Sequence, residues 1–357
     1  YIRSMMSLKY FAEINKTSIK STTDFEIHLV KGYNIIRERK NPDGSFSFKG
    51  RGKYESIWLT ALIVKCLKQL EDLITIDENL IENGLDFLQK FQIIPNSKLD
   101  DDFSGGFNEF GSNNEIDVSL TAFVIISFLE NTRYIEKYID VIRKGLDFLD
   151  KNTEHINNDL DFVICSYAFK LGNHSSAEDF LKLLRRKSTN DFRLVRPDQD
   201  SMSYRDELSK DIEFASYTLL TLLQIPNDRD VLPLYSLLLS KLNQYDDVFD
   251  SVITSQALAM IAKTYSTPTN FNLTLSYEGM KEMRHHVTNY DSFDLDFPKT
   301  AQNFEVSAEG EGIAILEFYF QYVTVVGDVH DQMFTLSVAN IELKNEYLLL
   351  KVCSSYR

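Results

Sequence analysis

The chain repeats one pattern at an offset of 61 residues, and this repeat constrains its fold more than any other feature. In each copy a glycine-aromatic turn precedes an apolar segment of helical length, and a second helical segment follows. The matching positions are Gly44 and Gly105, Phe46 and Phe107, Leu59-Thr60-Ala61 and Leu120-Thr121-Ala122, and GLDFLQK (84–90) and GLDFLDK (145–151). Such a repeat is a supersecondary unit that buries its apolar face by stacking on copies of itself.

Helical segments of two alternating kinds extend the pattern to about residue 265. One kind is apolar nearly all round, which predicts burial on both sides. Its members are 57–67, 116–129, 161–171, 212–223 and 252–262. The other kind, as in 135–149 and 177–184, carries a single apolar stripe and predicts a surface helix with an inward face. With a leading pair at 2–14 and 23–40, the alternation predicts an α/α toroid, a ring of helices inside a second ring.

Beyond residue 268 the apolar period falls from about 3.6 residues to two, which is typical of strands. The predicted strands are 271–277, 304–308, 334–338 and 348–352. The run Glu309–Gly312 predicts a hairpin turn from the strand 304–308 into the apolar segment IAILEFYFQYVTV (313–325). Neither β segment has enough strands to close a sandwich, and unpaired edges indicate missing partners. The predicted fold class is therefore mainly α, a toroid followed by incomplete antiparallel β-sandwich segments.

Charge and composition exclude several classes of partner. The formal net charge of -15 and the pI near 4.9 argue against nucleic acids and anionic membrane surfaces, since both would be repelled. No apolar run approaches the length that spans a bilayer. Cys66, Cys165 and Cys353 are odd in number and show no disulfide framework. We interpret Cys66 and Cys165, which lie within apolar helical runs, as buried free thiols.

The order of these features resembles a known family. The segments that carry the resemblance are 32–46, 58–67, 104–125, 212–223, 249–263, NFEVSAEGEGIAILEFYFQYVTV (303–325) and YLLLKVCSSY (347–356). Together they are similar to the thioester-containing proteins, which include alpha-2-macroglobulin and the complement components, and within them to the insect branch. The likeness covers essentially the whole chain.

The resemblance implies a domain organisation and a setting. It implies that residues 1–265 form the thioester-type toroid, 266–328 the C-terminal half of a CUB-like domain, and 329–357 the first strands of a receptor-binding β-sandwich. The chain is then expected to be an internal portion of a larger secreted protein, whose upstream CUB half and macroglobulin domains are its partners. Its expected targets are microbial surfaces or proteases, with no cofactor and no catalytic turnover.

The family's chemistry is acyl transfer from an internal thioester between a cysteine and a glutamine in a Gly-Cys-Gly-Glu-Gln motif. That motif is absent from this chain and would lie upstream of Tyr1. Family members that favour hydroxyl targets have a histidine five residues before the glycine equivalent to Gly105, where this chain has Asp100. A carboxylate cannot form an acyl-imidazole, so the resemblance implies direct reaction with amines, with Asp100 in a modulating role. The alternative is that Asp100–Asp102 is a solvated acidic loop.

Two other functions remain open at this point. A member without the thioester would act as a non-covalent adhesion or scaffold protein, which Asp100 also allows. Prenyltransferase β-subunits and terpene cyclases share the toroid and its Gly-Gly-Phe turns, but neither has the β segments seen here.

Three residues have side chains of the types that bind zinc. Asp161 and Cys165 lie one helical turn apart and His174 follows, and zinc accepts all three ligand types. Without a CxxC or HxxxH frame, we interpret Asp161 as a helix-start residue, Cys165 as core and His174 as a loop residue, and predict no metal. We interpret His285-His286 as surface residues in a polar stretch between strands.

Overall fold

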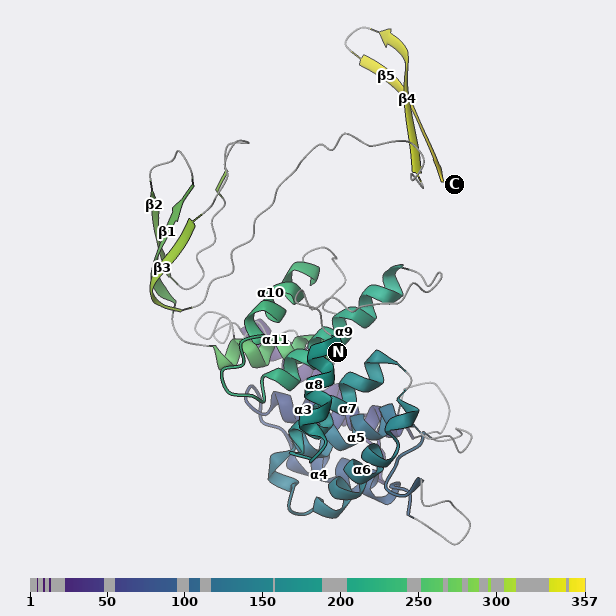
Figure 1. Ribbon diagram of the computed structural model, residues 1–357. Helices are drawn as coiled ribbons and strands as arrows, with labels where there is room; N and C mark the ends of the chain where they lie inside the picture. Colours follow the sequence, from purple (N-terminus) through teal and green to yellow (C-terminus); the bar gives the residue numbers. More distant parts are fainter. Residues whose placement is uncertain are drawn as a thin grey trace. The chain divides into compact units, whose positions relative to one another are not determined.

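The structure is a computed structural model, shown in Figure 1. It describes residues 5, 9, 13, 23–47, 55–94, 103–109, 117–156, 158–187, 204–242, 252–265, 269–277, 282–288, 295–296, 305–312, 334–344 and 347–356. The chain forms two compact units, Tyr1–Ile313 and Ala314–Arg357. The domain boundaries at residues 265 and 328 that the resemblance implies stay a prediction.

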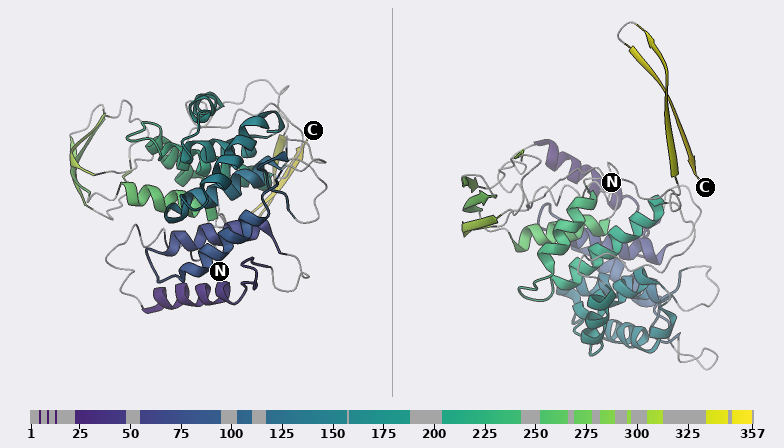
Figure 2. Two further views of the ribbon diagram at one scale, coloured as in Figure 1. Left: turned by 90° about the horizontal axis from the view of Figure 1, so that it is seen from below. Right: turned by 45° about the horizontal axis from the view of Figure 1, so that its top comes forward.

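The first unit is built on two sets of helices. The helices are α2 (Thr23–Arg37), α3 (Ile57–Leu70), α4 (Glu78–Lys90), α5 (Val118–Glu130), α6 (Ile139–Lys151), α7 (Asp159–Leu171), α8 (Ala177–Lys187), α9 (Tyr204–Leu222), α10 (Val231–Leu242) and α11 (Val252–Thr264). The odd-numbered helices α3 to α11 pack on one another in chain order, and α4, α6, α8 and α10 each pack on the helix before them. Figure 2 shows these helices from two further sides. The predicted toroid, with an inner and an outer set, is confirmed.

Burial follows this division. In α5 the buried residues run from Val118 to Leu129 with one exception, as expected for a helix covered on every side. In α6 the buried residues are Val141, Ile142, Gly145, Leu146, Phe148 and Leu149, a single face. The apolar pattern of each helix therefore fixes whether it lies in the inner or the outer set.

Polar contacts tie the last inner helix back to the first. The Lys263 ammonium, at the end of α11, lies 3.3 Å from the carboxylate of Asp72, in the turn that follows α3. Lys9, on an earlier helical segment, lies 3.8 Å from the same carboxylate. These contacts join residues that are distant in sequence, as closure of a ring requires.

The repeated glycine occupies the same place in both copies. Gly44 and Gly105 have φ of +97° and +93°, a backbone conformation that residues with a Cβ atom rarely adopt. A Cβ at Gly44 would overlap the backbone carbonyl of Asn83, and one at Gly105 would overlap that of Lys144. Each turn thus lies directly on the outer helix of its own repeat, and the 61-residue offset holds in space as well as in sequence.

A threonine holds the aromatic residue of each turn. The backbone N–H of Phe46 donates to Thr60 Oγ1 at 3.1 Å, and that of Phe107 donates to Thr121 Oγ1 at 2.9 Å. Both phenylalanines are fully buried, so neither amide could be satisfied by water. The Leu-Thr-Ala triplet of the repeat is therefore a packing and hydrogen-bonding device.

Replacing Thr121 with valine tests this role, because valine keeps the shape and removes the acceptor. We expect the free energy of unfolding to fall by about 1–3 kcal/mol, the cost of a buried N–H left without a partner. Thr60→Val should have a similar effect. Thr264→Val is the control, since the exposed Thr264 hydroxyl donates to the carbonyl of Met260 and no buried N–H among the described residues depends on it. Urea denaturation followed by far-UV circular dichroism measures all three, and equal effects of Thr121→Val and Thr264→Val would contradict the assignment.

The first unit also contains a three-stranded antiparallel sheet of order β2-β1-β3. Its strands are β1 (Asn270–Ser276), β2 (Met283–Thr288) and β3 (Glu305–Glu311). Phe271, Leu273 and Leu275 of β1 are buried together with Val287 of β2, which confirms the two-residue period. The residues of β3 are all exposed.

Two interpretations of this region are wrong. The run Glu309–Gly312 is not a hairpin turn, because Glu309 to Glu311 lie in β3 and pair with β1. Gly310, with φ of +137°, lies so close to β1 that a Cβ would overlap the backbone there, so its glycine serves a close approach of strands. His285 and His286 are not between strands either, since both belong to β2.

The second unit is a hairpin of β4 (Phe334–Lys344) and β5 (Tyr347–Tyr356). The strands pair antiparallel from Phe334↔Tyr356 to Lys344↔Tyr347, with an irregularity between Asn340 and Glu342. The predicted second hairpin is confirmed.

Candidate functional site

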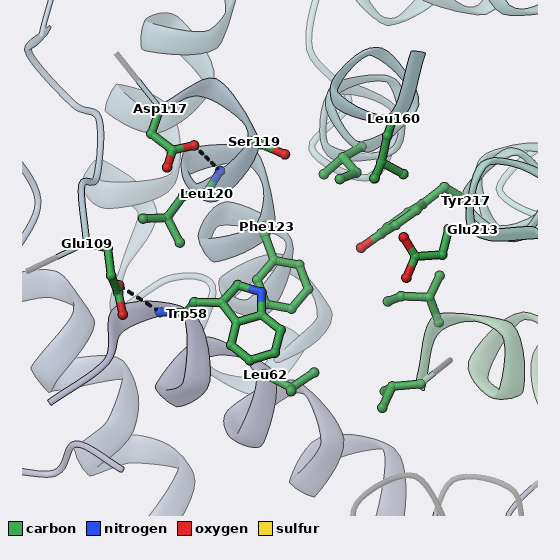
Figure 3. A pocket seen from close by; sticks show the side chains of 13 residues that line it. Trp58, Leu62, Glu109, Asp117, Ser119, Leu120, Phe123, Leu160, Glu213 and Tyr217 are labelled. Carbon is green, nitrogen blue, oxygen red and sulfur yellow. Dashed lines mark hydrogen bonds between the residues drawn. The ribbon is translucent and has the colours of Figure 1, made fainter. Parts of the chain in front are cut away.

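A pocket of about 510 Å³ opens where several inner helices begin. We call it the mouth pocket, and Figure 3 shows it. It is lined by Trp58, Leu62, Glu109, Asp117, Ser119, Leu120, Phe123, Leu160, Ile164, Glu213, Tyr217, Val252 and Ile253. Five inner helices, α3 to α11, therefore contribute to one concave surface.

The wall of the mouth pocket is largely aromatic and aliphatic. Trp58, the single tryptophan of the chain, is 44% exposed although it is a large apolar residue. Its ring stacks on Phe123, with centroids 6.2 Å apart and an interplanar angle of 21°. Figure 3 shows the two rings side by side at the centre of the pocket. Exposed aromatic surface of this kind is typical of binding sites.

Two of the three carboxylates that line the pocket cap inner helices. Glu109 accepts hydrogen bonds from the backbone N–H groups of Ile57 and Trp58, at 3.0 and 3.2 Å, at the start of α3. Asp117 accepts from the N–H of Leu120 at 2.8 Å, at the start of α5. Helix N-termini stabilise negative charge, so these two carboxylates are partly compensated where they stand.

The third carboxylate has a different setting. Glu213 lies in the middle of α9, so it does not cap its own helix. Figure 3 shows its carboxylate and the Tyr217 hydroxyl on the same wall, both facing the pocket.

Asp161, next to the pocket residue Leu160, has a raised pKa. Burial is the main cause, and the negative charge of Asp117 adds to it, whereas a hydrogen bond with Ser119 acts in the opposite direction. Negative charge therefore accumulates at this end of the inner ring.

A polar cluster lies deeper in the inner ring, and we call it the Glu130 hub. Glu130 Oε1 accepts hydrogen bonds from Tyr167 Oη at 3.0 Å and from Gln256 Nε2 at 2.8 Å. Gln69 Nε2 donates to the other carboxylate oxygen at 3.3 Å. The Lys65 ammonium lies 3.4 Å from Oε1. Side chains of α3, α5, α7 and α11 thus meet at one buried carboxylate.

Lys65 is the buried cation of this hub. Its side chain is 1% exposed, and its ammonium has no hydrogen-bond partner among the described residues. It lies 5.6, 6.0 and 5.8 Å from the ring centroids of Phe123, Tyr167 and Tyr217. Phe123 and Tyr217 also line the mouth pocket, so the ammonium lies behind the pocket wall. Burial raises the pKa of Tyr167 and of Tyr217 well above the ordinary value of a tyrosine, so both hydroxyls stay protonated.

The comparison with protein families agrees with this fold. The family model described as "A-macroglobulin TED domain" matches residues 2–260, the helical part of the chain. The chain belongs to this family. The finding decides against prenyltransferases and terpene cyclases as owners of this toroid, since the match covers most of the chain.

Individual relatives of the TED-domain chain point the same way. "Thioester-containing protein 1 allele R1" of Anopheles gambiae is 26% identical over 349 residues, which are 92% of this chain and 24% of that protein. "Ovostatin" of Gallus gallus is 28% identical over 321 residues, 83% of this chain and 21% of that protein. The chain therefore spans about a quarter of the length of these curated relatives.

The residue nominated for chemistry in the TED domain, Asp100, lies outside the described residues, as do Asp101 and Asp102. Its modulating role stays a prediction. No helix in the described part of the chain is long and apolar enough to cross a bilayer.

The three candidate metal ligands, Asp161, Cys165 and His174, have separate structural roles. The backbone N–H of Asp161 donates to Oδ1 of its cap residue Asn158 at 2.9 Å, and the Asp161 carboxylate accepts from the Asn158 side-chain amide at 2.8 Å. Cys165 is fully buried in α7, and burial raises its pKa. His174 stacks on Phe169, with ring centroids 5.0 Å apart. Within the described ranges, no three acidic, histidine or cysteine side chains are grouped so as to hold a metal ion.

The mouth pocket and the Glu130 hub were not predicted from the sequence. Each offered a weak signal: Lys65 is a charge inside the apolar run IWLTALIVKCL, and Trp58 opens the same run. Their partners lie far along the chain, at Glu130, Tyr217 and Gln256, and periodicity does not indicate which of these meet.

Proposed function

We propose that this chain is the TED region of a secreted, complement-like or alpha-2-macroglobulin-like protein of innate immunity, which marks microbial surfaces or traps proteases. The observation that carries the proposal is the family match over the helical region, together with the likeness to thioester-containing protein 1 across almost the whole chain. The relatives are several times longer than this chain, so the rest of such a protein would supply the segments that flank it.

The proposed chemistry is a single acyl transfer. The amine nitrogen of a target attacks the thioester carbonyl, a C–N bond forms, the C–S bond breaks, and the cysteine leaves as a thiolate that takes up a proton. Both thioester residues would come from chain upstream of Tyr1. Asp100 cannot carry an acyl group as an imidazole does, so the proposed acceptors are amines. Each thioester is consumed once, and the protein is not an enzyme in the sense of turnover.

Methylamine treatment of the full-length protein tests the thioester. We expect one thiol to be released per chain, measured by titration with a thiol reagent under native conditions. Cys66 and Cys165 should contribute no background, because both are buried and burial raises the pKa of Cys66 to about 12. No released thiol would contradict the covalent mechanism and support a non-covalent adhesion or scaffold protein.

A variant of the same experiment tests the role of Asp100. In the Asp100→His variant we expect incorporation of glycerol, a hydroxyl nucleophile, to rise by about a hundredfold or more relative to methylamine, within the usual range for a positioned acid-base group. An unchanged ratio would assign Asp100–Asp102 to a solvated loop.

A further inference from the structure

Two tripeptides of the form Asn-x-Ser/Thr lie within the described part of the chain. They are NHS (173–175), in the turn that follows α7, and NLT (272–274), within β1. This tripeptide, the sequon, is the acceptor of N-linked glycans at the surface of secreted proteins. Because the motif is short and also arises by chance, the surroundings of each asparagine have to decide whether it can carry a glycan.

The first asparagine projects from a turn that is held by its neighbour. Asn173 is exposed and has φ of +49°, a conformation that asparagine adopts more readily than most residues. The His174 N–H donates to the carbonyl of Phe169 at 3.0 Å, and the imidazole stacks on the Phe169 ring. Ser175 is exposed too. Among the described residues nothing bonds to the side chain of Asn173 or of Ser175, so the turn itself does not require the serine.

The second asparagine lies on the exposed face of the three-stranded sheet. Leu273 is buried, so Asn272 and Thr274 point to the opposite face of β1. His286 Nδ1 lies 3.0 Å from Asn272 Oδ1. This contact uses the amide oxygen and leaves Nδ2, the atom that a glycan takes, without a partner among the described residues. The acceptor atom is therefore available in the folded chain.

The rest of this sheet face is polar. Asn272 stands in the central strand between His286 of β2 and Glu309 of β3, and both neighbours are exposed. Arg284 and Glu311 lie on the same face and are exposed as well. Packing another sheet on this face would strip water from these side chains, which is costly. A hydrated glycan leaves them in water, so the face suits a glycan better than a protein partner.

Asn173 lies at the end of the toroid away from the mouth pocket. Leu160, near the start of α7, lines that pocket, whereas Asn173 comes two residues after Leu171, where the same helix ends. At about 1.5 Å per residue, α7 separates the two positions by about 20 Å. A glycan on Asn173 therefore leaves the mouth pocket accessible.

We propose that Asn173 and Asn272 carry N-linked glycans. The inference rests on the proposed function in one respect, secretion, because the modification takes place in the secretory pathway. There a transferase moves an oligosaccharide from a lipid diphosphate: Nδ2 gives up a proton and bonds to the anomeric carbon of the sugar, the bond from that carbon to the diphosphate breaks, and the lipid diphosphate leaves. The chain supplies only the acceptor, and the glycans keep both surfaces hydrated and free of protein partners.

Peptide mapping of the full-length protein, secreted by eukaryotic cells, tests both sites. Trypsin places the two asparagines on separate peptides, 171–182 and 264–281. Enzymatic release of the glycans in heavy-oxygen water converts each glycosylated asparagine to labelled aspartate. We expect most copies to be labelled at Asn173 and at Asn272. Asn270, on the same peptide as Asn272 but outside a sequon, is the internal control and should stay unlabelled.

Variants that destroy a sequon without touching its asparagine complete the test. For Ser175→Ala and for Thr274→Val we expect the secreted protein to lose one glycan each, seen as one step in electrophoretic mobility, and the double variant to lose two. Asn270→Gln should leave the mobility unchanged. Ser175 is exposed, and valine keeps the shape and strand preference of Thr274, so both variants should fold. If either is not secreted, the peptide map of the wild-type protein still decides.

An unlabelled peptide from the secreted protein would overturn the proposal at that site, as would unchanged mobility of its variant. Labelling of Asn270 as strong as that of Asn272 would also overturn the assignment of Asn272. These outcomes are distinct from failure of the proposed function. Glycosylated peptides from a protein that releases no thiol with methylamine would keep both sites and remove the acyl transfer, whereas a protein retained inside the cell without glycans would contradict both.

Discussion

Replacing Glu130 with alanine is expected to lower the free energy of unfolding by about 3–5 kcal/mol, the usual cost of leaving a buried charge without its partner. The Lys65 and Glu130 side chains are 1% and 7% exposed, and their charged atoms lie 3.4 Å apart. Without the carboxylate, the ammonium keeps only the aromatic faces around it, which do not replace a counter-charge. Tyr167 and Gln256 would each lose an acceptor as well. Urea denaturation monitored by far-UV circular dichroism measures this loss of stability.

A double variant separates the charge from the loss of packing. In Lys65→Met with Glu130→Gln both charges are gone, and glutamine keeps an oxygen that can accept from Tyr167 and Gln256. We expect this variant to be more stable than Glu130→Ala by at least about 2 kcal/mol. Asp140→Ala breaks an exposed ion pair with Arg143 and should leave stability unchanged within error. If the double variant is no more stable than Glu130→Ala, the hub is held by packing and the electrostatic account fails.

The Glu130 hub also explains why the toroid is specified as one assembly. Pairwise packing of neighbouring inner helices requires only apolar surface, which many arrangements could satisfy. A buried carboxylate that needs donors from α3, α7 and α11 at once is satisfied only when these helices stand in one register. Because an unmet buried polar group is costly, the hub disfavours alternative packings.

The sequence was informative about the fold because the fold is built from local signals. Helix 118–130 is apolar all round, which predicts the inner ring, and helix 139–151 has a single apolar stripe, which predicts the outer ring. The positive φ of Gly44 and Gly105 follows from a local turn that the repeat displays twice. The two-residue apolar period at 270–276 likewise predicts the strand that the structure shows there.

The sequence does not predict the candidate site, because the residues of the site come together only when the ring of helices closes. Trp58 and Glu213 are separated by most of the toroid in sequence, and Lys65 is separated from Gln256 by even more. The same limit explains the error at Glu309–Gly312: glycines next to acidic residues are typical of a turn, but here Gly310 lets β3 approach β1. Asp100 follows from the resemblance alone, and its modulating role stays a prediction.

The Gly105→Ala substitution is the second change with a large expected effect, a loss of about 2–6 kcal/mol that combines a strained φ with overpacking. The new Cβ would overlap the carbonyl oxygen of Lys144, which is backbone and cannot rotate away. The turn cannot shift to relieve this overlap at little cost. The N–H of Gly105 donates to the carbonyl of Ile93 at 2.9 Å, and its own carbonyl accepts from Gln92 Nε2 at 3.0 Å. Thermal and urea denaturation of the 357-residue chain measure the loss.

Gly172→Ala is the matched control, since it makes the same chemical change under different constraints. Gly172 has φ of -81°, which any residue adopts, and a Cβ there would first meet a terminal methyl of Leu146 that can move. We expect a loss of about 1 kcal/mol or less. Gly44→Ala should behave like Gly105→Ala, because its Cβ would overlap the carbonyl of Asn83 in the same way. If Gly44→Ala and Gly105→Ala were as mild as Gly172→Ala, the turns would not be fixed on the outer helices, and the repeat would have no common structural cause.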